Sequence, residues 1–455
     1  MNLTNRVLSF FKEISAIPRQ SGNEKSMQNY LVNFAQMRKF DFYQDEFNNV
    51  IIYKKTADKE PIILQAHTDM VFVTSGNYFS AKQNNGVKLA KKGRWMYAKD
   101  TSLGADDGIG IALILAILDS DIPCNIEAVF TATEETTMRG AYNIDVTKLK
   151  AKKMICLDGF ENNAIVVSSA SFTDFLVKFN QQTLPHNAYN ANYHWYRIDI
   201  KGLLGGHSGF DIDKNRGNSH QMAITLLQRF SNVKLSQMIG GHQFNVIPTN
   251  TTTVFATMDD AKQVDTIVKT FLIEQSTLFP LMQIDVVELK EPQSVLCCSD
   301  NIFNFIAEFQ YGVLLKDEDG NVLVSQNLSE IDTKKGIIKI GLRSNLKDKE
   351  NSMLNNLQTL CQKHGLNWEI IDTQPGFETL QNSLLLYDLQ RVNSNSKKIK
   401  MHIAVECGIF QTRMENLDTV IISPTILCAH SVQEKLDLDS VKNTARWLEK
   451  YLKLN

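Results

Sequence analysis

Four short apolar runs constrain the fold of this chain more than any other feature. They are PIILQAH (61–67), IEAVFTA (126–132), KMICLD (153–158) and TVIISPT (419–425). Continuous apolar runs of this length are typical of strands that are buried on both faces of a sheet. Helical patterns alternate with them, among them the apolar stretch 107–118. The alternation predicts an α/β fold in which helices cover both faces of the sheet.

The middle of the chain has a different pattern. YRIDIKG (196–202) and NTTTVFATM (250–258) alternate apolar and polar residues, and a helical stretch at about 217–230 lies between them. Alternation of this kind is typical of strands with one face in water. KGIIKIGLRS (335–344) repeats the strand pattern. We therefore expect an α+β domain here, with helices on one side of its sheet.

The tail returns to α/β character, with a helix near 384–392, the apolar strand 419–425 and a last helix near 440–452. The simplest organisation is one α/β domain formed by two chain segments, with a second domain inserted between them. We place the first segment at 1–171, the inserted domain at 172–374 and the second segment at 375–455.

A local pattern near the N-terminus predicts the start of a helix. Ser21-Gly22-Asn23-Glu24 matches a capping box, with serine as the N-cap and glutamate three positions later. The pattern predicts a helix that begins after Ser21 and extends to about Met37.

Composition narrows the classes of partner. The 455 residues include 48 Lys and Arg against 50 Asp and Glu, for a formal net charge of −2. We therefore expect neither nucleic acid nor an anionic membrane as a partner. No apolar stretch is long enough to cross a bilayer, and the first residues lack a small-residue cleavage site. The seven cysteines form no CxxC pair, which favours a cytoplasmic protein with reduced thiols.

Polar side chains gather where the apolar strands end. His67, Asp69, Glu134, Glu135, Asp158 and His430 all lie at or shortly after such an end. Ligands of open α/β sheets bind beyond the carboxyl ends of the strands. Asp106 lies in GADDG at the start of the helix 107–118, and the glycines beside it permit a tight turn.

These residues have two interpretations. Each one alone is most simply a polar loop residue, and adjacent glutamates are usually a solvated pair. Together, the carboxylates would repel one another unless a cation neutralised them. Two histidines with three carboxylates form a nitrogen and oxygen ligand set that suits zinc, manganese or cobalt. A bridging carboxylate, with one histidine and one carboxylate for each ion, would form a two-metal site.

Seven motifs in a fixed order point to a known family. QAHTDM, LGADDGIGIAL, TATEETTMRGA, CLDGFE, GGHSG, HIAVECGIF and AHSVQE resemble those of the M20 metallopeptidases. The likeness is strongest to the aminoacyl-histidine dipeptidase (cytosol non-specific dipeptidase) branch and spans nearly the whole chain. It implies a di-zinc exopeptidase-like α/β catalytic domain, with a mixed sheet flanked by helices, and an inserted α+β lid domain.

The resemblance also assigns the metal ligands. It makes Asp106 the bridging ligand of two divalent ions, most simply Zn²⁺, with Mn²⁺ or Co²⁺ as alternatives. His67 and Asp158 would complete one site, and Glu135 and His430 the other.

Three further roles concern the reaction. The resemblance makes Glu134 the general base, which takes a proton from the attacking water and passes it to the leaving amine. Asp69 would accept the second N–H of His67 and fix its tautomer. His207, on the glycine-rich turn GLLGGHSG of the lid domain, would stabilise the oxyanion.

The expected substrate contacts are weaker inferences from the sequence. Asn245 and Arg343 are candidates for holding the C-terminal carboxylate, and the guanidinium suits that task through bidentate geometry. Glu406 is a candidate for pairing with the free amino terminus of a dipeptide. For Asn245 and Arg343, a turn residue and a surface charge are the simpler alternatives.

The expected activity is hydrolysis of free dipeptides by a broad-specificity, Xaa-His-type dipeptidase that acts as a monomer or homodimer. The alternatives are an N-acyl-amino-acid amidohydrolase or carboxypeptidase of the same clan, and a catalytically silent peptide-binding relative. The chain departs from the family pattern at Asp107, because GADNG is usual where GADDG stands here. The extra carboxylate bears on metal binding, and none of the departures removes a ligand or the base.

Overall fold

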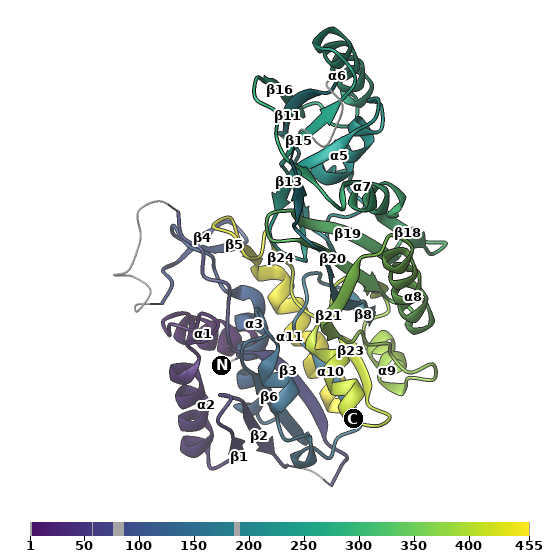
Figure 1. Cartoon of the computed structure of the whole chain (residues 1–455). Coiled ribbons are helices and arrows are strands. Elements are labelled where there is room, and N and C mark those ends of the chain that lie inside the picture. Colours follow the sequence, from purple (N-terminus) through teal and green to yellow (C-terminus); the bar gives the residue numbers. More distant parts are fainter. Residues whose placement is uncertain (1, 57, 76–85, 186–191, 455) are drawn as a thin grey trace. The chain divides into compact units, whose positions relative to one another are not determined.

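The computed structural model describes residues 2–56, 58–75, 86–185 and 192–454, which form two compact units (Figure 1). The first unit contains Met1–Ser169, Gly376–Met401 and Val405–Asn455, and the second contains Ala170–Pro375 and His402–Ala404. The expectation that 1–171 and 375–455 are catalytic and that 172–374 is a lid stays a prediction about the roles of these segments.

An eight-stranded sheet forms the centre of the first unit. Its order is β1 (Asp41–Gln44), β2 (Val50–Lys54), β6 (Ile126–Thr131), β3 (Ile62–His67), β7 (Lys153–Cys156), β23 (Asp418–Ile421), β8 (Ala164–Ser169) and β22 (Lys397–Met401). The neighbours β6, β3, β7 and β23 run parallel. They contain the four apolar runs of the sequence, so the prediction of these strands is confirmed. Both β3 and β6 are buried at every position, as strands covered on both faces must be.

Seven α-helices are described in this unit, together with the 3₁₀ turn Val146–Lys148. The helices are α1 (Leu3–Ser15), α2 (Lys25–Arg38), α3 (Ala105–Leu118), α4 (Arg139–Asn143), α9 (Leu384–Val392), α10 (Glu406–Arg413) and α11 (Leu438–Leu454). Every residue of α3 is buried. It packs against β3 and is contacted by α1 and α11, because a helix that is apolar all round is stable only inside a core. The C-terminal segment thus completes the core that the N-terminal segment begins.

The start of α2 differs from the prediction. The helix begins at Lys25, and Glu24 rather than Ser21 is its N-cap residue, with no side-chain capping bond. The Ser21 hydroxyl instead donates to Asp69 Oδ2 at 2.7 Å. The prediction of a capping box is therefore wrong. The Ser21 hydroxyl bonds to Asp69, a residue distant in sequence, and not to a backbone N–H of the helix. The helix itself is confirmed and ends at Arg38.

A smaller sheet in the first unit closes a loop that the site uses. Its strands are, in order, β24 (Ile426–Leu427), β25 (Lys435–Asp437), β5 (Trp95–Ala98) and β4 (Leu89–Lys92). All three pairings are antiparallel. The β24–β25 pair closes the loop 428–434, which carries His430.

The second unit contains a nine-stranded sheet in which every pairing is antiparallel. Its order is β16 (Gln283–Leu289), β11 (His194–Lys201), β15 (Thr251–Thr257), β13 (Lys234–Gly241), β19 (Val322–Asp332), β20 (Ile337–Ser344), β9 (Ser171–Lys178) and β21 (Asn367–Gln374), and β18 (Gly312–Lys316) pairs with β19. The strands expected at 196–202, 250–258 and 335–344 are β11, β15 and β20, so these predictions are confirmed.

Helices and two small sheets complete the second unit. The helices are α5 (Ser219–Leu227), α6 (Ala261–Gln275), α7 (Ser299–Glu308) and α8 (Lys347–Lys363). One small sheet pairs β10 (Thr183–Leu184) with β17 (Val295–Leu296), and the other pairs β12 (Gly206–His207) with β14 (Val246–Ile247). The helix expected near 217–230 is α5. Sheet and helices share one apolar core, which contains Phe175, Phe255 and Phe271.

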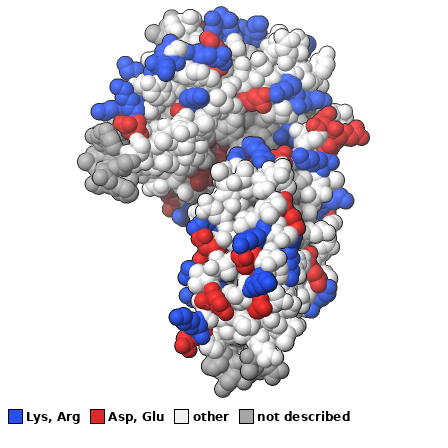
Figure 2. Space-filling view, turned by 90° about the horizontal axis from the view of Figure 1, so that it is seen from above, with Lys and Arg blue, Asp and Glu red and all other residues white. Residues whose placement is uncertain are grey.

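Charges of both signs are interspersed on the face of the molecule drawn in Figure 2. This agrees with the nearly balanced totals of 48 basic and 50 acidic residues. Among the described residues, no helix combines the length and the apolar character that crossing a bilayer requires.

Candidate metal centre and substrate contacts

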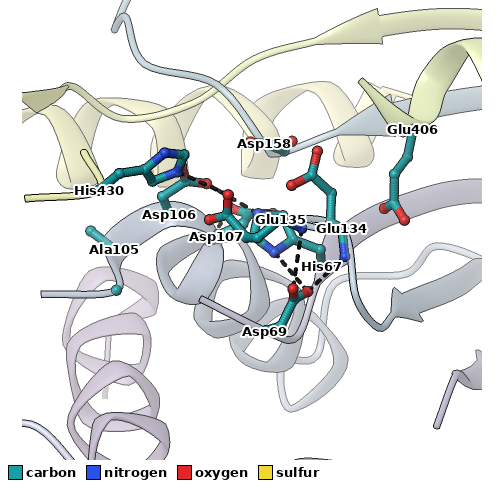
Figure 3. A network of polar contacts seen from close by, with 12 residues as sticks. His67, Asp69, Ala105, Asp106, Asp107, Glu134, Glu135, Asp158, Glu406 and His430 are labelled. Atoms are coloured by element: carbon teal, nitrogen blue, oxygen red, sulfur yellow. Dashed lines mark hydrogen bonds and ion pairs between the residues drawn. The ribbon is translucent and has the colours of Figure 1, made fainter. Parts of the chain in front are cut away.

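The predicted polar residues of the first unit lie together beyond the parallel strands (Figure 3). His67 is the last residue of β3, and Asp158 follows β7 by two residues. The glutamate pair Glu134 and Glu135 follows β6. Since β6, β3 and β7 run parallel, their carboxyl ends share one edge of the sheet, and each strand delivers its polar residue there.

Asp106 lies at the centre of this group. Its Oδ1 is 3.1 Å from His67 Nε2, and its Oδ2 is 3.1 Å from His430 Nε2. His430 Nε2 also lies 2.9 Å from Glu135 Oε2. One carboxylate therefore faces two imidazoles through its two oxygens, which is the arrangement that a bridging ligand requires.

The atoms of the group fit a divalent cation. His67, Asp106 and Glu135 each offer one ligand atom, and these atoms all lie within 4.8 Å of one another. The second oxygen of Glu135, Oε1, is buried and has no hydrogen-bond partner within the described part of the chain. Imidazole nitrogens combined with carboxylate oxygens are ligands that zinc and related ions accept. The residues present thus form a candidate metal site.

The electrostatics of the carboxylates support a cation. Burial, with Asp106 as a close neighbour, raises the pKa of Asp158 to about 7. Burial also raises the pKa of Glu135, with a further contribution from Asp106. Acidic groups shift in this direction when their ionised forms lack enough positive charge nearby. A divalent ion between them would supply that charge.

Protons on the two histidines balance part of this negative charge. Burial favours the neutral ring of His430, but its bonds to Asp106 and Glu135 win and raise its pKa to about 11, although 45% of the side chain is exposed. Burial opposes protonation of His67 as well, and bonds with Asp106 and Asp69 raise its pKa well above the usual value. These shifts favour a proton on both rings, on atoms that a metal ion would use.

Asp69 connects the histidine to the glutamate pair. Its Oδ1 is 3.4 Å from His67 Nδ1, the nitrogen that faces away from Asp106. The same carboxylate accepts the backbone N–H of Glu134 at 3.0 Å and that of Glu135 at 3.2 Å. Asp69 is fully buried. It therefore orients the His67 ring and fixes the turn from which both glutamates leave.

The two glutamates differ in their surroundings. Glu135 turns toward His430, whereas the Glu134 side chain leaves the chain in another direction (Figure 3). Burial raises the pKa of Glu134 well above its usual value, His67 opposes that shift, and the charges of Glu135, Asp158 and Glu406 add to it. Glu134 thus holds a proton more readily than an exposed glutamate does.

Glu406 lies in the same buried region. It is the first residue of α10 and only 2% exposed. Its Oε2 accepts from Gln65 Nε2 at 2.7 Å and from the Thr131 hydroxyl. Burial raises its pKa to about 8, which the bond from Thr131 opposes. The sequence did not predict Gln65 and Thr131 as residues of this site. The available signal was that each is a polar residue inside an apolar strand.

The second unit brings three other predicted residues together. β12 pairs with β14, so His207 lies opposite Val246, and Ser208 N–H donates to the carbonyl of Asn245 at 2.8 Å. Arg343 Nε donates to Ser208 Oγ at 3.2 Å. The guanidinium is buried, and it lies 4.0 Å from the centre of the Phe172 ring. Burial lowers its pKa to about 9, while the charge of Asp174 acts in the opposite direction.

The hydrogen bonds of His207 indicate its tautomer. Its Nδ1 accepts the backbone N–H groups of Gly209 at 3.1 Å and Phe210 at 3.3 Å. An acceptor at Nδ1 leaves the proton on Nε2. The neutral ring therefore presents a donor at Nε2. Arg343 Nη2 lies 3.5 Å from this atom and can only donate, so the two groups form no hydrogen bond in this tautomer.

Comparisons with known proteins agree with this fold. No family model matches the chain. The cytosol non-specific dipeptidase of Escherichia coli is 27% identical over 469 residues, which cover 97% of this chain and 96% of that protein. The resemblance to the M20 dipeptidases is confirmed. The aminoacylhistidine dipeptidase of Vibrio alginolyticus has the same fold, with a TM-score of 0.83 at 24% identity, and 100% of this chain and 98% of that chain are covered.

A more distant structure agrees on the fold alone. A tripeptidase of Staphylococcus aureus matches with a TM-score of 0.57 at 16% identity, over 99% of this chain and 98% of that one. The predicted fold class, an α/β domain with a mixed sheet and an inserted α+β domain, is confirmed.

The protonated histidines lead to a testable prediction. A metal ion binds only neutral imidazole and ionised carboxylate, so ions that bind at His67 and His430 should displace a net number of protons from the site at pH 7. Titration calorimetry of the apoprotein with Zn²⁺, in buffers of different ionisation enthalpy, measures this number. Because the raised pKa values favour the protons, metal affinity should fall as the pH is lowered. Heats that do not depend on the buffer would contradict the prediction.

Proposed function

We propose that this protein is a metal-dependent hydrolase that cleaves the peptide bond of free dipeptides. The carboxylate of Asp106, which faces His67 and His430 with Glu134 close by, is the observation that carries the proposal. Relatives that span nearly the whole chain are a cytosol non-specific dipeptidase and an aminoacylhistidine dipeptidase. We infer a broad substrate range that includes dipeptides of the Xaa-His type.

The proposed metal ligands are those that the family resemblance assigns. Asp106 would hold two ions, His67 and Asp158 would complete one site, and Glu135 and His430 the other. The short distances from Asp106 to His67 and His430, and from His430 to Glu135, support these residues as ligands. Bound ions would supply Lewis-acid polarisation of the scissile carbonyl and lower the pKa of a water. We propose Zn²⁺, with Mn²⁺ or Co²⁺ as alternatives, because the ligand set is mixed nitrogen and oxygen.

Glu134 is the proposed general base. Its raised pKa suits a group that takes a proton from the attacking water and then gives it to the leaving amine. Asp69 supports this transfer without taking part in it, because its bond to the backbone of Glu134 fixes where that side chain starts. It would also accept the proton of neutral His67 at Nδ1, which leaves Nε2, the atom that faces Asp106, free to bind a metal ion.

Residues of the second unit are proposed to act on the substrate. His207 presents a donor at Nε2, which suits stabilisation of the oxyanion that forms on the scissile carbonyl. Arg343 is a buried guanidinium with a lowered pKa. The carboxylate of a bound substrate would pair with its positive charge and stabilise the protonated form. Asn245 lies beside His207 and is proposed as a further contact of that carboxylate.

Glu406 remains the proposed partner of the substrate amino group. Its carboxyl is buried, and its Oε1 has no hydrogen-bond partner among the described residues. An ammonium group would lower its raised pKa and stabilise the ionised form. This pairing would favour dipeptides with a free amino terminus over N-acylated substrates.

The cellular setting is also a proposal. A cytosolic relative and seven free cysteines support a cytoplasmic location. The near-neutral net charge supports small peptides rather than nucleic acid as partners. A monomer or a homodimer is expected.

A substrate panel tests the proposed function. Unblocked dipeptides should be hydrolysed. N-acetyl amino acids should be poor substrates because Glu406 requires a free ammonium group, and longer peptides because their second residue has an amide where Arg343 and Asn245 are proposed to bind a carboxylate. The measurement is product release from matched blocked and unblocked substrates with added Zn²⁺, Mn²⁺ or Co²⁺. Turnover of blocked substrates alone would favour the amidohydrolase or carboxypeptidase alternative. Hydrolysis of none of them would favour the silent peptide-binding relative.

Two substitutions separate the base from the ligands. Glu134→Gln should lower kcat at least about 100-fold, the effect of losing a general base, while metal content stays near that of the wild type. His430→Ala should lose one ion, because it removes a nitrogen that faces both Asp106 and Glu135. Metal analysis of both purified variants beside their kinetics checks the assignment. Equal metal loss in the two variants would show that the roles are wrong.

The role of His207 has its own test. His207→Ala should lower kcat about 100- to 1000-fold, the usual cost of one oxyanion donor, without a change in metal content. His194→Ala is the matched control, because His194 is an exposed histidine of the same unit. A rise in KM alone, with kcat retained, would contradict stabilisation of the oxyanion.

A further inference from the structure

One buried carboxylate holds the loop that presents Asp106. Glu434 Oε2 accepts the backbone N–H groups of Leu103 at 2.8 Å and Gly104 at 3.0 Å. Its Oε1 accepts that of Ala105 at 2.7 Å and lies 3.5 Å from the nitrogen of Asp106. Glu434 is 2% exposed. Its two oxygens thus serve the successive N–H groups that the start of α3 leaves without helical partners.

The same loop is held from its other side. The guanidinium of Arg19 donates to the carbonyl oxygens of Gly104, Thr68 and Asp69. Gly104 has φ +67°, and a Cβ at this position would lie 2.6 Å from Arg19 Nη2. The N–H of Gly104 therefore donates to Glu434, and its carbonyl oxygen accepts from Arg19. The loop has little freedom to move Asp106.

Glu434 also lies on the segment that presents the second histidine. It follows His430 by four residues, inside the loop closed by the β24–β25 pair. Its own N–H donates to the carbonyl of Ser431 at 3.1 Å. His430 has φ +62° and Cys428 has φ +55°, a backbone region that costs conformational energy for residues with a Cβ. Such a conformation persists only where the surroundings impose it, and the buried Glu434 side chain is the anchor of this loop.

We propose that Glu434 is a positioning residue that sets the separation between Asp106 and His430 and so determines metal affinity, although it presents no atom to the ion. The inference rests on the proposed metal site. One side chain joins the Asp106 loop and the His430 loop, which lie 324 residues apart in sequence. The Asp106 Oδ2 to His430 Nε2 distance of 3.1 Å depends on both loops.

The chain offers a matched control in Glu127. This carboxylate is also buried, at 5% exposure, and it accepts the backbone N–H of Lys150 at 3.0 Å and that of Ala151 at 3.1 Å. It belongs to the same unit but lies near the start of β6, whereas the glutamate pair follows the end of that strand. Loss of either carboxylate removes the acceptor of two or more backbone amides. Only the loss of Glu434 should change the metal ligands.

The experiment compares Glu434→Gln, Glu434→Asp and Glu127→Gln with the wild type. A glutamine would turn a donor toward an N–H group that needs an acceptor, and an aspartate is too short to reach all of the amides. Each apoprotein is titrated with Co²⁺ and followed by the visible absorption of the bound ion, and its urea unfolding is measured without metal. Glu434→Gln should bind Co²⁺ about 10- to 100-fold more weakly, with an altered spectrum. Glu434→Asp keeps the charge, so it gives a second measurement if the glutamine variant fails to fold.

The outcomes separate this inference from the proposed function. Glu127→Gln should lose stability to a similar degree and keep the affinity and spectrum of the wild type. Unchanged Co²⁺ affinity in a folded Glu434 variant would overturn the positioning role and leave the proposed function intact. Equal weakening in the Glu127 and Glu434 variants would reduce Glu434 to a stabilising residue. A wild type that binds no Co²⁺ would overturn both proposals.

Discussion

The balance of charge around Asp106 is the constraint on which the rest of this structure depends. Asp106 is 5% exposed, and the buried carboxyls of Asp69, Asp158 and Glu406 lie in the same region. Ionised carboxylates removed from water are costly unless each has a partner. Here the partners are two imidazoles whose raised pKa values favour the protonated form, and the backbone amides that bind Asp69 and Glu434. A site that holds this much negative charge is organised for a cation.

The parallel strands allow the fold to accommodate this concentration of charged side chains. Their side chains are buried on both faces up to the residues where the strands end. The polar atoms begin only there, at one edge, where loops can supply hydrogen bonds. His67 illustrates the division: its backbone pairs with Thr131 of β6, while its ring faces Asp106 on one side and Asp69 on the other. The strand fixes the position of the ring and the two carboxylates fix its orientation.

Much of this could be predicted from the sequence, because the signals are local. An apolar run predicts a buried strand, and a histidine or carboxylate at its end is a candidate ligand, so β3, β6 and β7 and their polar residues were found together. Glu434 gave no comparable signal, since its role depends on amides about 330 residues earlier in the chain. Ser21 is the opposite case, in which a clear local signal gave a wrong prediction. Its capping pattern was locally sound, but the hydroxyl bonds Asp69, a partner that only the tertiary structure supplies.

Asp107 shows how the structure changes the meaning of a sequence difference. The sequence has GADDG in place of the GADNG of the family pattern that it resembles, which suggests an added negative charge beside the proposed bridging ligand. The Asp107 side chain is buried, and its Oδ1 accepts the N–H of Gly110 at 3.1 Å. Burial, with the charge of Asp158 as the next contribution, raises its pKa well above the usual value and so favours the neutral carboxyl. A neutral carboxyl has nearly the shape of an asparagine amide and likewise combines a donor with an acceptor. The substitution therefore changes the charge of the site less than the sequence implies, and the local bond to Gly110 can persist in either form.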